Sequence, residues 1–215
     1  MSLKGHGSLN SHLKNIICNS LKSAKMNRIQ WKSRRTLYLV ISLVSFYLTV
    51  RIKTYEHKAS VVLPETHPND AWEFVADFSN MKLLNPTIID FTILAESGNY
   101  DHWKYSTQYS EFLSHWPYLR NVAVAHFEVK AKPKENIYLI NSVHKTCLLF
   151  GFFCLDSESE FKFSQNDTLK GALCEENISY QCPAIMSSFC RREVLFQRTA
   201  IMNNLKMHFR KKHRS

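Results

Sequence analysis

The alternation of apolar and polar residues between positions 86 and 183 constrains the fold of this chain more than any other feature of its sequence. Successive side chains of a strand point to opposite faces, so a period of two indicates strands with one buried and one solvated face. Turn-forming residues interrupt the alternation at Ser97-Gly98-Asn99, at Pro133-Lys134 and around Phe150-Gly151. The pattern therefore predicts about six successive strands.

A seventh strand and one helix are predicted ahead of these six strands. The run from Lys58 to Leu63 is β-rich and is ended by Pro64. Asp70 and Glu73 have the spacing of a capping box at the start of a helix, and the helix ends at Asn85 because the residue before a proline avoids the helical region. Between these points apolar residues recur at helical spacing, namely Ala71, Phe74, Val75 and Phe78.

The chain is predicted to end in a long helix that runs from Pro183 to Lys211. The segment contains no glycine and no further proline, and basic residues gather at its end, where the helix dipole favours them. A broad apolar stripe is expected to lie against the sheet, and it consists of Ile185, Phe189, Leu195, Phe196, Met202, Leu205 and Phe209. The predicted class is therefore α+β, with a curved antiparallel sheet of about seven strands around a long C-terminal helix.

One stretch of this pattern resembles a known superfamily. The stretch "AWEFVADFSNMKLLNP" is similar to the Val-Trp-x-x-(Val/Leu)-x-Asp-Phe-x-x-(hydrophobic)-x-x-x-x-Pro region of polyketide cyclases and coenzyme Q-binding proteins. These proteins form one branch of the START-like, helix-grip (SRPBCC) superfamily, and the resemblance in element order covers residues 58–211. It implies a cavity between the sheet and the C-terminal helix that holds a lipid or another hydrophobic molecule.

Residues that face such a cavity can be sought on the predicted inner faces. Small residues on an inward face leave volume, and Ala123, Ala125 and Ala131 alternate there with larger residues. Ligand pockets are mostly apolar with a few placed polar groups. The candidate ligand-binding residues are Trp103, Tyr105, Tyr109, Phe127, Leu195 and Met202. Each of them would serve equally well as ordinary core.

The apolar sequence "CLLFGFFC" from Cys147 to Cys154 is predicted to form a hairpin. Its tip is either buried by the long helix, or it enters a membrane or gates the cavity through Leu149, Phe150 and Phe152. A two-residue loop would place Cys147 opposite Cys154, which permits a disulfide in an oxidising compartment, although buried free cysteines explain the pattern equally well. Cys182 and Cys190 flank the start of the long helix.

The N-terminal part has a different character. Residues 1–35 contain eight Lys or Arg and no acidic residue, which indicates a basic and flexible tail. Thr36 to Val50 contains no charged residue and is apolar nearly all round, so we predict a single transmembrane anchor over residues 36–52, followed by a ligand-binding domain over residues 56–215. Fifteen helical residues reach about 22 Å, which is short for a bilayer.

The flanking charges predict how such an anchor is oriented. The excess of basic residues precedes the apolar run, so the N-terminus is expected in the cytosol and the domain in the lumen or outside the cell. Two sequons, at Asn166 and Asn177, are compatible with a glycoprotein. The acid-free N-terminus also resembles a mitochondrial transit segment, and the alternative location is the mitochondrial inner membrane.

Charge and motifs exclude several function classes. Ten of the 28 Lys and Arg residues precede Glu56, which leaves 18 to balance the 18 acidic residues, so the domain lacks the basic surface of a nucleic-acid-binding protein. No catalytic motif, cofactor motif or metal-ligand spacing is present, and pairs such as Glu158 with Glu160 or His126 with Glu128 are explained by solvated strand faces. A membrane-bound protein that binds or transfers a hydrophobic ligand is favoured, and the alternatives are a cyclase-type enzyme or a ligand-free interaction domain.

Overall fold

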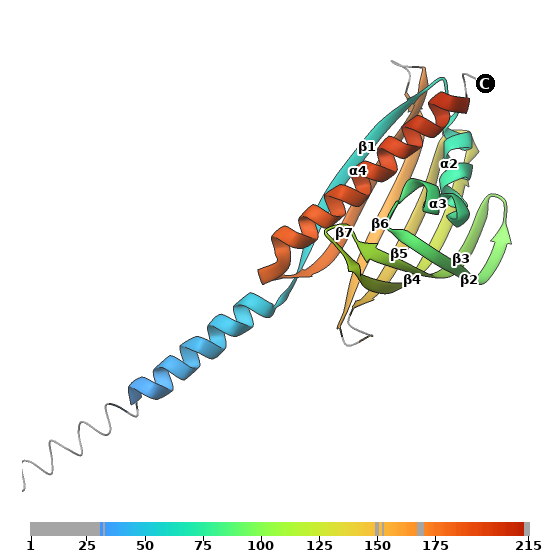
Figure 1. Cartoon of the computed structure of the whole chain (residues 1–215). Coiled ribbons are helices and arrows are strands. Elements are labelled where there is room, and N and C mark those ends of the chain that lie inside the picture. The colour runs from blue at the N-terminus through green and yellow to red at the C-terminus, as the bar shows by residue number, and fades with distance from the viewer. Residues whose placement is uncertain (1–30, 32, 149–150, 152, 167–169, 213–215) are drawn as a thin grey trace, which may run out of the picture. The chain divides into compact units, whose positions relative to one another are not determined.

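The computed structural model describes residue 31 and residues 33–148, 151, 153–166 and 170–212, and the chain divides into two units between Arg51 and Ile52 (Figure 1). In the first unit residues 33–50 form a helix whose large apolar side chains are exposed. Among the described residues no helix combines the length and the apolar character needed to cross a membrane. The spanning anchor predicted over residues 36–52 is therefore not found, and Ile52 belongs to a strand.

The second unit is built on one antiparallel sheet of seven strands. The strands are β1 (Ile52–Pro64), β2 (Ile88–Asn99), β3 (His102–Leu113), β4 (Trp116–Lys132), β5 (Ile137–Leu148), β6 (Phe153–Asn166) and β7 (Gly171–Pro183). Their spatial order is β1-β7-β6-β5-β4-β3-β2, so every strand from β2 to β7 pairs with its neighbour in sequence. The number and kind of strands predicted from the alternation are confirmed.

The helices lie on the concave face of this sheet (Figure 1). They are α2 (Pro68–Ala76), α3 (Phe78–Leu84) and α4 (Ser187–Lys212), and short 3₁₀ turns occur at Pro133–Glu135 and Ala184–Met186. The C-terminal half of α4 packs beside α2 and α3, where Asn204 donates to the carbonyl oxygen of Leu84 at 2.8 Å and Phe74 contacts Phe209. The predicted order of strand, helical segment, six strands and long helix is confirmed.

The helical segment before β2 differs from the prediction in two ways. It starts at Pro68 with His67 as the N-cap, so the capping box predicted from Asp70 and Glu73 is wrong; Glu73 instead accepts hydrogen bonds from Asn69 and Tyr100. It also breaks into two helices at Asp77, whose carboxylate accepts a hydrogen bond from the backbone amide of Ser79 at 2.9 Å and so caps α3.

The predicted apolar stripe of α4 is correct only in its C-terminal half. Met202, Leu205 and Phe209 are buried, whereas Ile185, Leu195 and Phe196 are 69%, 50% and 43% exposed. In the N-terminal half the cavity is lined by Phe189 of the predicted stripe and by Cys190, Glu193, Val194, Gln197, Arg198 and Ile201, which were not predicted. Three of these seven are polar, so apolar character locates the inward face there only at Phe189.

Two disulfides close short loops of the second unit. One joins Cys147 and Cys154 across the β5–β6 pair, and the other joins Cys182 at the end of β7 to Cys190 in the first turn of α4. Cys174 is a buried free thiol, and burial raises its pKa. The residues expected to gate the cavity, Leu149, Phe150 and Phe152, lie outside the described residues.

Replacing Asp77 with alanine tests the break between α2 and α3. Loss of the cap leaves the Ser79 amide without its carboxylate acceptor, and we expect Asp77→Ala to lower the free energy of unfolding by about 1 kcal/mol in urea denaturation. Asp70→Ala is the matched control, because Asp70 makes no cap bond, and its effect should stay within about 0.5 kcal/mol. A larger loss in the control than in Asp77→Ala would contradict this capping assignment.

Candidate functional site

A cavity of about 400 Å³ lies between the concave face of the sheet and α4. Strands β2 to β7 supply its floor, α4 its roof, and α2 and α3 contribute Val75 and Phe78 at one end. More than half of the lining side chains are apolar or aromatic, including Phe127, Ile140 and Phe161. Trp116 and Met186 also line the cavity but are 59% and 38% exposed, so they mark its rim.

A buried ion pair crosses the cavity from sheet to helix. The Nη1 atom of Arg198 on α4 lies 2.7 Å from Oε1 of Glu176 on β7, and the hydroxyl of Ser159 donates to the same carboxylate oxygen at 2.7 Å. The side chain of Glu176 is fully buried and that of Arg198 is 15% exposed. Burial raises the pKa of Glu176 although Arg198 and Ser159 act in the opposite direction.

A second buried carboxyl group, Glu111 on β3, also faces this interior. Burial raises its pKa to about 7, the charge of Glu193 adds to the rise, and the charge of Arg198 opposes it. Side-chain hydrogen bonds from Thr87 and Gln197 hold the group in place. Glu111 therefore changes its protonation state near neutral pH, which few carboxyl groups in proteins do.

The third carboxyl group of the cavity attaches α4 to the turn between β3 and β4. Glu193 accepts hydrogen bonds from the backbone amide of Ser114 at 2.9 Å and from its hydroxyl at 2.7 Å. His115 lies 3.5 Å from the same carboxylate. Glu193 is buried, so these donors replace the water that an exposed carboxylate would bind.

A tyrosine, a histidine and a serine form a chain of contacts along the floor. The hydroxyl of Tyr109 lies 3.0 Å from Nδ1 of His144, and Nε2 of His144 lies 2.8 Å from the hydroxyl of Ser142. Burial, assisted by the charge of Arg198, lowers the pKa of His144 to about 3, so its imidazole is neutral at physiological pH. The described residues contain no cluster of potential metal ligands.

The predicted ligand-binding residues occupy different places. Tyr109 and Phe127 line the cavity. Trp103 and Tyr105 pack against α2 instead, where Trp103 contacts Trp72 and the Tyr105 hydroxyl donates to the carbonyl oxygen of Ala76 at 2.9 Å. Met202 is part of the core and Leu195 is exposed. As ligand contacts, all six stay predictions.

Comparison with solved structures identifies the fold of the second unit. No family model matches the sequence, and no curated protein matches it. Among solved structures, a protein from Thermus thermophilus superimposes with a TM-score of 0.54 at 9% identity, covering 74% of this chain and 99% of its own. A conserved protein from Geobacillus kaustophilus gives 0.51 at 12% identity, covering 73% and 96%. The chain has the START-like, helix-grip fold.

A further match carries the START name itself. A START superfamily protein from Mycobacterium smegmatis aligns with a TM-score of 0.45 at 14% identity, covering 74% of this chain and 97% of its own. At such low identities the likeness concerns the helix-grip architecture alone. The chemistry of this helix-grip cavity must therefore be argued from its own residues.

The polar residues of the helix-grip cavity were not among the predicted site residues, although two signals point to them. Glu111 lies two residues beyond Tyr109 on the same face of β3, and Glu176 lies between the inward residues Cys174 and Ile178 of β7. On α4, Glu193 and Gln197 stand four residues apart and share a face. Following each face by position rather than by hydrophobicity would have found them.

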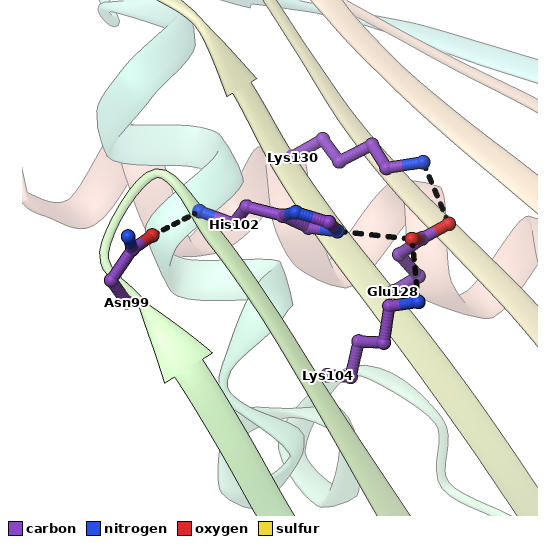
Figure 2. Close-up of polar contacts among 5 residues, drawn as sticks. All are labelled: Asn99, His102, Lys104, Glu128 and Lys130. Atoms are coloured by element: carbon purple, nitrogen blue, oxygen red, sulfur yellow. Dashed lines mark hydrogen bonds and ion pairs between the residues drawn. The ribbon is translucent and has the colours of Figure 1, made fainter.

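The outer face of the helix-grip sheet carries a separate charged cluster, which Figure 2 shows. Glu128 on β4 contacts Lys130 at 2.7 Å, His102 at 3.0 Å and Lys104 at 3.0 Å, and these donors lower its pKa to about 2. Glu158 and Glu160 are exposed on β6, in agreement with the solvated strand face expected for them. The contacts of Glu128 are therefore surface ion pairs.

The pKa of Glu111 makes a prediction about stability and pH. Between pH 4.5 and 7 the unfolded chain releases the Glu111 proton while the folded chain retains it, so the contribution of Glu111 to the stability of the wild type falls as pH rises through this window. Glu111→Gln removes this titration. Its free energy of unfolding relative to wild type should rise by up to about 3 kcal/mol across the window, as measured by urea denaturation at a series of pH values.

The difference between wild type and Glu111→Gln reports the titration of Glu111 alone, because His144 and Glu176 titrate in both proteins. Glu160→Gln removes an exposed carboxylate and is the matched control for the loss of one negative charge. A difference between Glu111→Gln and wild type that stays constant across the window would show that Glu111 ionises normally in the fold.

Proposed function

We propose that the second unit binds a hydrophobic small molecule in the cavity between the sheet and α4. One observation carries this proposal: about 400 Å³ of space is enclosed by a mainly apolar wall into which a few buried polar groups project. Ligand pockets of proteins have this composition and volumes of about 300–1,000 Å³. The helix-grip fold supports the proposal through its architecture only.

The same fold is compatible with two other functions. A ligand-free interaction domain would be expected to fill the interior with side chains, and the cavity argues against it. A cyclase-type enzyme would need acid–base groups in the cavity, and Glu111 is one such group. Tyr109 and His144 are held in their neutral forms by burial, which limits their use in proton transfer. Binding is therefore the better-supported function.

We also propose that the chain associates with a lipid bilayer through the helix at residues 33–50. Apolar side chains are exposed around this helix, including Leu39, Val40 and Val44, and Arg34 and Arg35 stand at its start. Exposed apolar surface of this extent marks a site of interaction, and flanking arginines suit anionic headgroups. Transfer of the bound molecule to or from that bilayer is part of this proposal.

The compartment proposed for the domain is an oxidising one, either the lumen of the secretory pathway or the cell exterior. Two disulfides support this, because such bonds persist mainly where thiols are not kept reduced. Asn177 is exposed on β7, as a glycosylated asparagine must be. The mitochondrial inner membrane remains the alternative location.

Blocking the cavity tests the binding function. Thr146 on β5 lines the cavity, and Thr146→Trp fills part of it with an indole ring. The full chain, purified from a eukaryotic host, should carry a co-purified apolar molecule in native mass spectrometry, and Thr146→Trp should lose most of it because the two compete for one volume.

Lys145→Trp provides the matched control, because Lys145 is the adjacent residue and is exposed on the outer face. It should retain the bound molecule at the wild-type level. Equal loss in both variants, or equal retention in both, would count against a ligand in this cavity. Circular dichroism confirms that each variant is folded before the comparison is made.

Charges placed in the apolar helix test membrane association. The full chain should sediment with liposomes that contain anionic lipid, and the double variant Val40→Asp, Val44→Asp should reduce the bound fraction at least about tenfold, because an aspartate inside a bilayer costs about 3 kcal/mol. The matched control is Val122→Asp with Val143→Asp, two valines exposed on the sheet to a similar degree. A comparable reduction in the control would show that the sheet, and not the helix, contacts the lipid.

A further inference from the structure

Three buried polar atoms of the described residues have no hydrogen-bond partner there, and all three belong to side chains that line the cavity. They are Oδ1 of Asn121, Oε2 of Glu176 and Nε of Arg198. An unsatisfied buried polar group costs about 1–3 kcal/mol, so such groups are rarely left without a partner in a folded protein. Two of these atoms are acceptors and one is a donor. A bound molecule that satisfies all three must therefore supply two hydrogen-bond donors and one acceptor.

The charges of the cavity favour a particular sign of ligand. Three buried carboxyl groups, those of Glu111, Glu176 and Glu193, line it together with the exposed carboxylate of Asp156. Arg198 is the one Lys or Arg residue among its described lining residues. The imidazole of His144 adds no positive charge, because burial holds it neutral. The Oε1 atom of Glu176 is already shared by Arg198 and Ser159, while Oε2 remains free to accept a proton donor.

We propose that the cavity holds an amphipathic amine, whose protonated amino group donates to Oε2 of Glu176 while its apolar tail lies among Phe127, Ile140 and Phe161. This inference rests on the proposed binding function and adds the chemical class of the ligand. An ammonium group has three donors and a positive charge, so it meets both the free acceptors and the surplus of carboxyl groups. An oxygen next to the amine on the same ligand would accept a hydrogen bond from Nε of Arg198.

Other head groups fit the same cavity less well. An alcohol supplies a hydrogen-bond donor but leaves the carboxyl surplus without a counter-charge. A carboxylate head would add a fourth acidic group to a buried space with one guanidinium, and like charges at short range in a dry interior repel strongly. The expected order of affinity is therefore amine first, alcohol second and carboxylate last.

Three probes that share the same apolar tail and differ in head group separate the contribution of the head group to affinity from that of the tail. Decylamine, 1-decanol and decanoate, each radiolabelled, are measured by equilibrium dialysis against the full chain below the concentrations at which they aggregate. Binding to the cavity is taken as the difference between wild type and Thr146→Trp, which removes any contribution from the exposed N-terminal helix. Decylamine should bind at least about tenfold more tightly than decanoate, the effect of one favourable charge pair, and more tightly than decanol.

The outcomes distinguish the two proposals. If no probe binds wild type more than Thr146→Trp, the binding function itself is wrong for ligands of this size. If all three bind equally, or decanoate binds most tightly, the cavity binds apolar tails but the amine assignment is overturned.

Substitution of one carboxyl group gives an independent check on the head group. Glu176→Gln keeps the shape of the side chain and removes its charge, so the preference for decylamine over decanol should fall severalfold. Glu160→Gln, on the exposed face of β6, should leave the preference unchanged. Should Glu176→Gln fail to fold, Glu111→Gln removes another cavity carboxyl and should lower the same ratio. An unchanged ratio in the folded cavity variants would overturn the proposal.

Discussion

The buried contact between Arg198 of α4 and Glu176 of β7 is the interaction on which the remaining arrangement depends. Buried charges are tolerated only when they are paired, so this contact fixes both the rotation of α4 about its axis and its position over the sheet. The rotation places Ile201, Leu205 and Phe209 in the core further along the helix. It also turns Glu193 toward Ser114 at the other end. Polar groups hold the N-terminal half of α4, and apolar packing holds its C-terminal half. The cavity therefore lies under the N-terminal half, and the C-terminal half packs directly on the core.

The filled end of the domain explains why the cavity has its present extent. Trp72 of α2 is fully buried, donates to the carbonyl oxygen of Leu139 and packs against Trp103 and Tyr138. Ala123 and Ala125, which were expected to leave open volume, are fully buried and do not line the cavity. The cavity is bounded at this end by Val75 of α2 and by Phe78 and Met81 of α3. The two short helices therefore limit its extent.

The sequence carries some of the physical signals that determine this fold and lacks others. The strands follow from side-chain alternation and from turn residues such as Gly98, where φ is +117° and an added Cβ would lie 2.4 Å from the carbonyl oxygen of His102. The break at Asp77 was not predicted, because no glycine or proline marks it and the helical spacing of apolar residues continues through it. The inward face of α4 was misassigned for a related reason: hydrophobicity locates a buried face only when the face is apolar, and here it carries Glu193, Gln197 and Arg198. The polar residues of the site were therefore not predicted either.

A cavity lined by partly unsatisfied polar groups lowers the stability of the domain. The two disulfides lie beside this cavity and offset part of the loss. The first links the paired ends of β5 and β6, where Leu148 and Phe153 line the cavity, and the second joins the end of β7 to the first turn of α4. A cross-link that closes a loop of seven or eight residues stabilises a fold by about 2–3 kcal/mol, mainly by restricting the unfolded chain. That gain is similar to the cost of one buried polar atom without a partner. The bonds thus permit a polar, incompletely packed interior at the end of the domain that α2 and α3 do not fill.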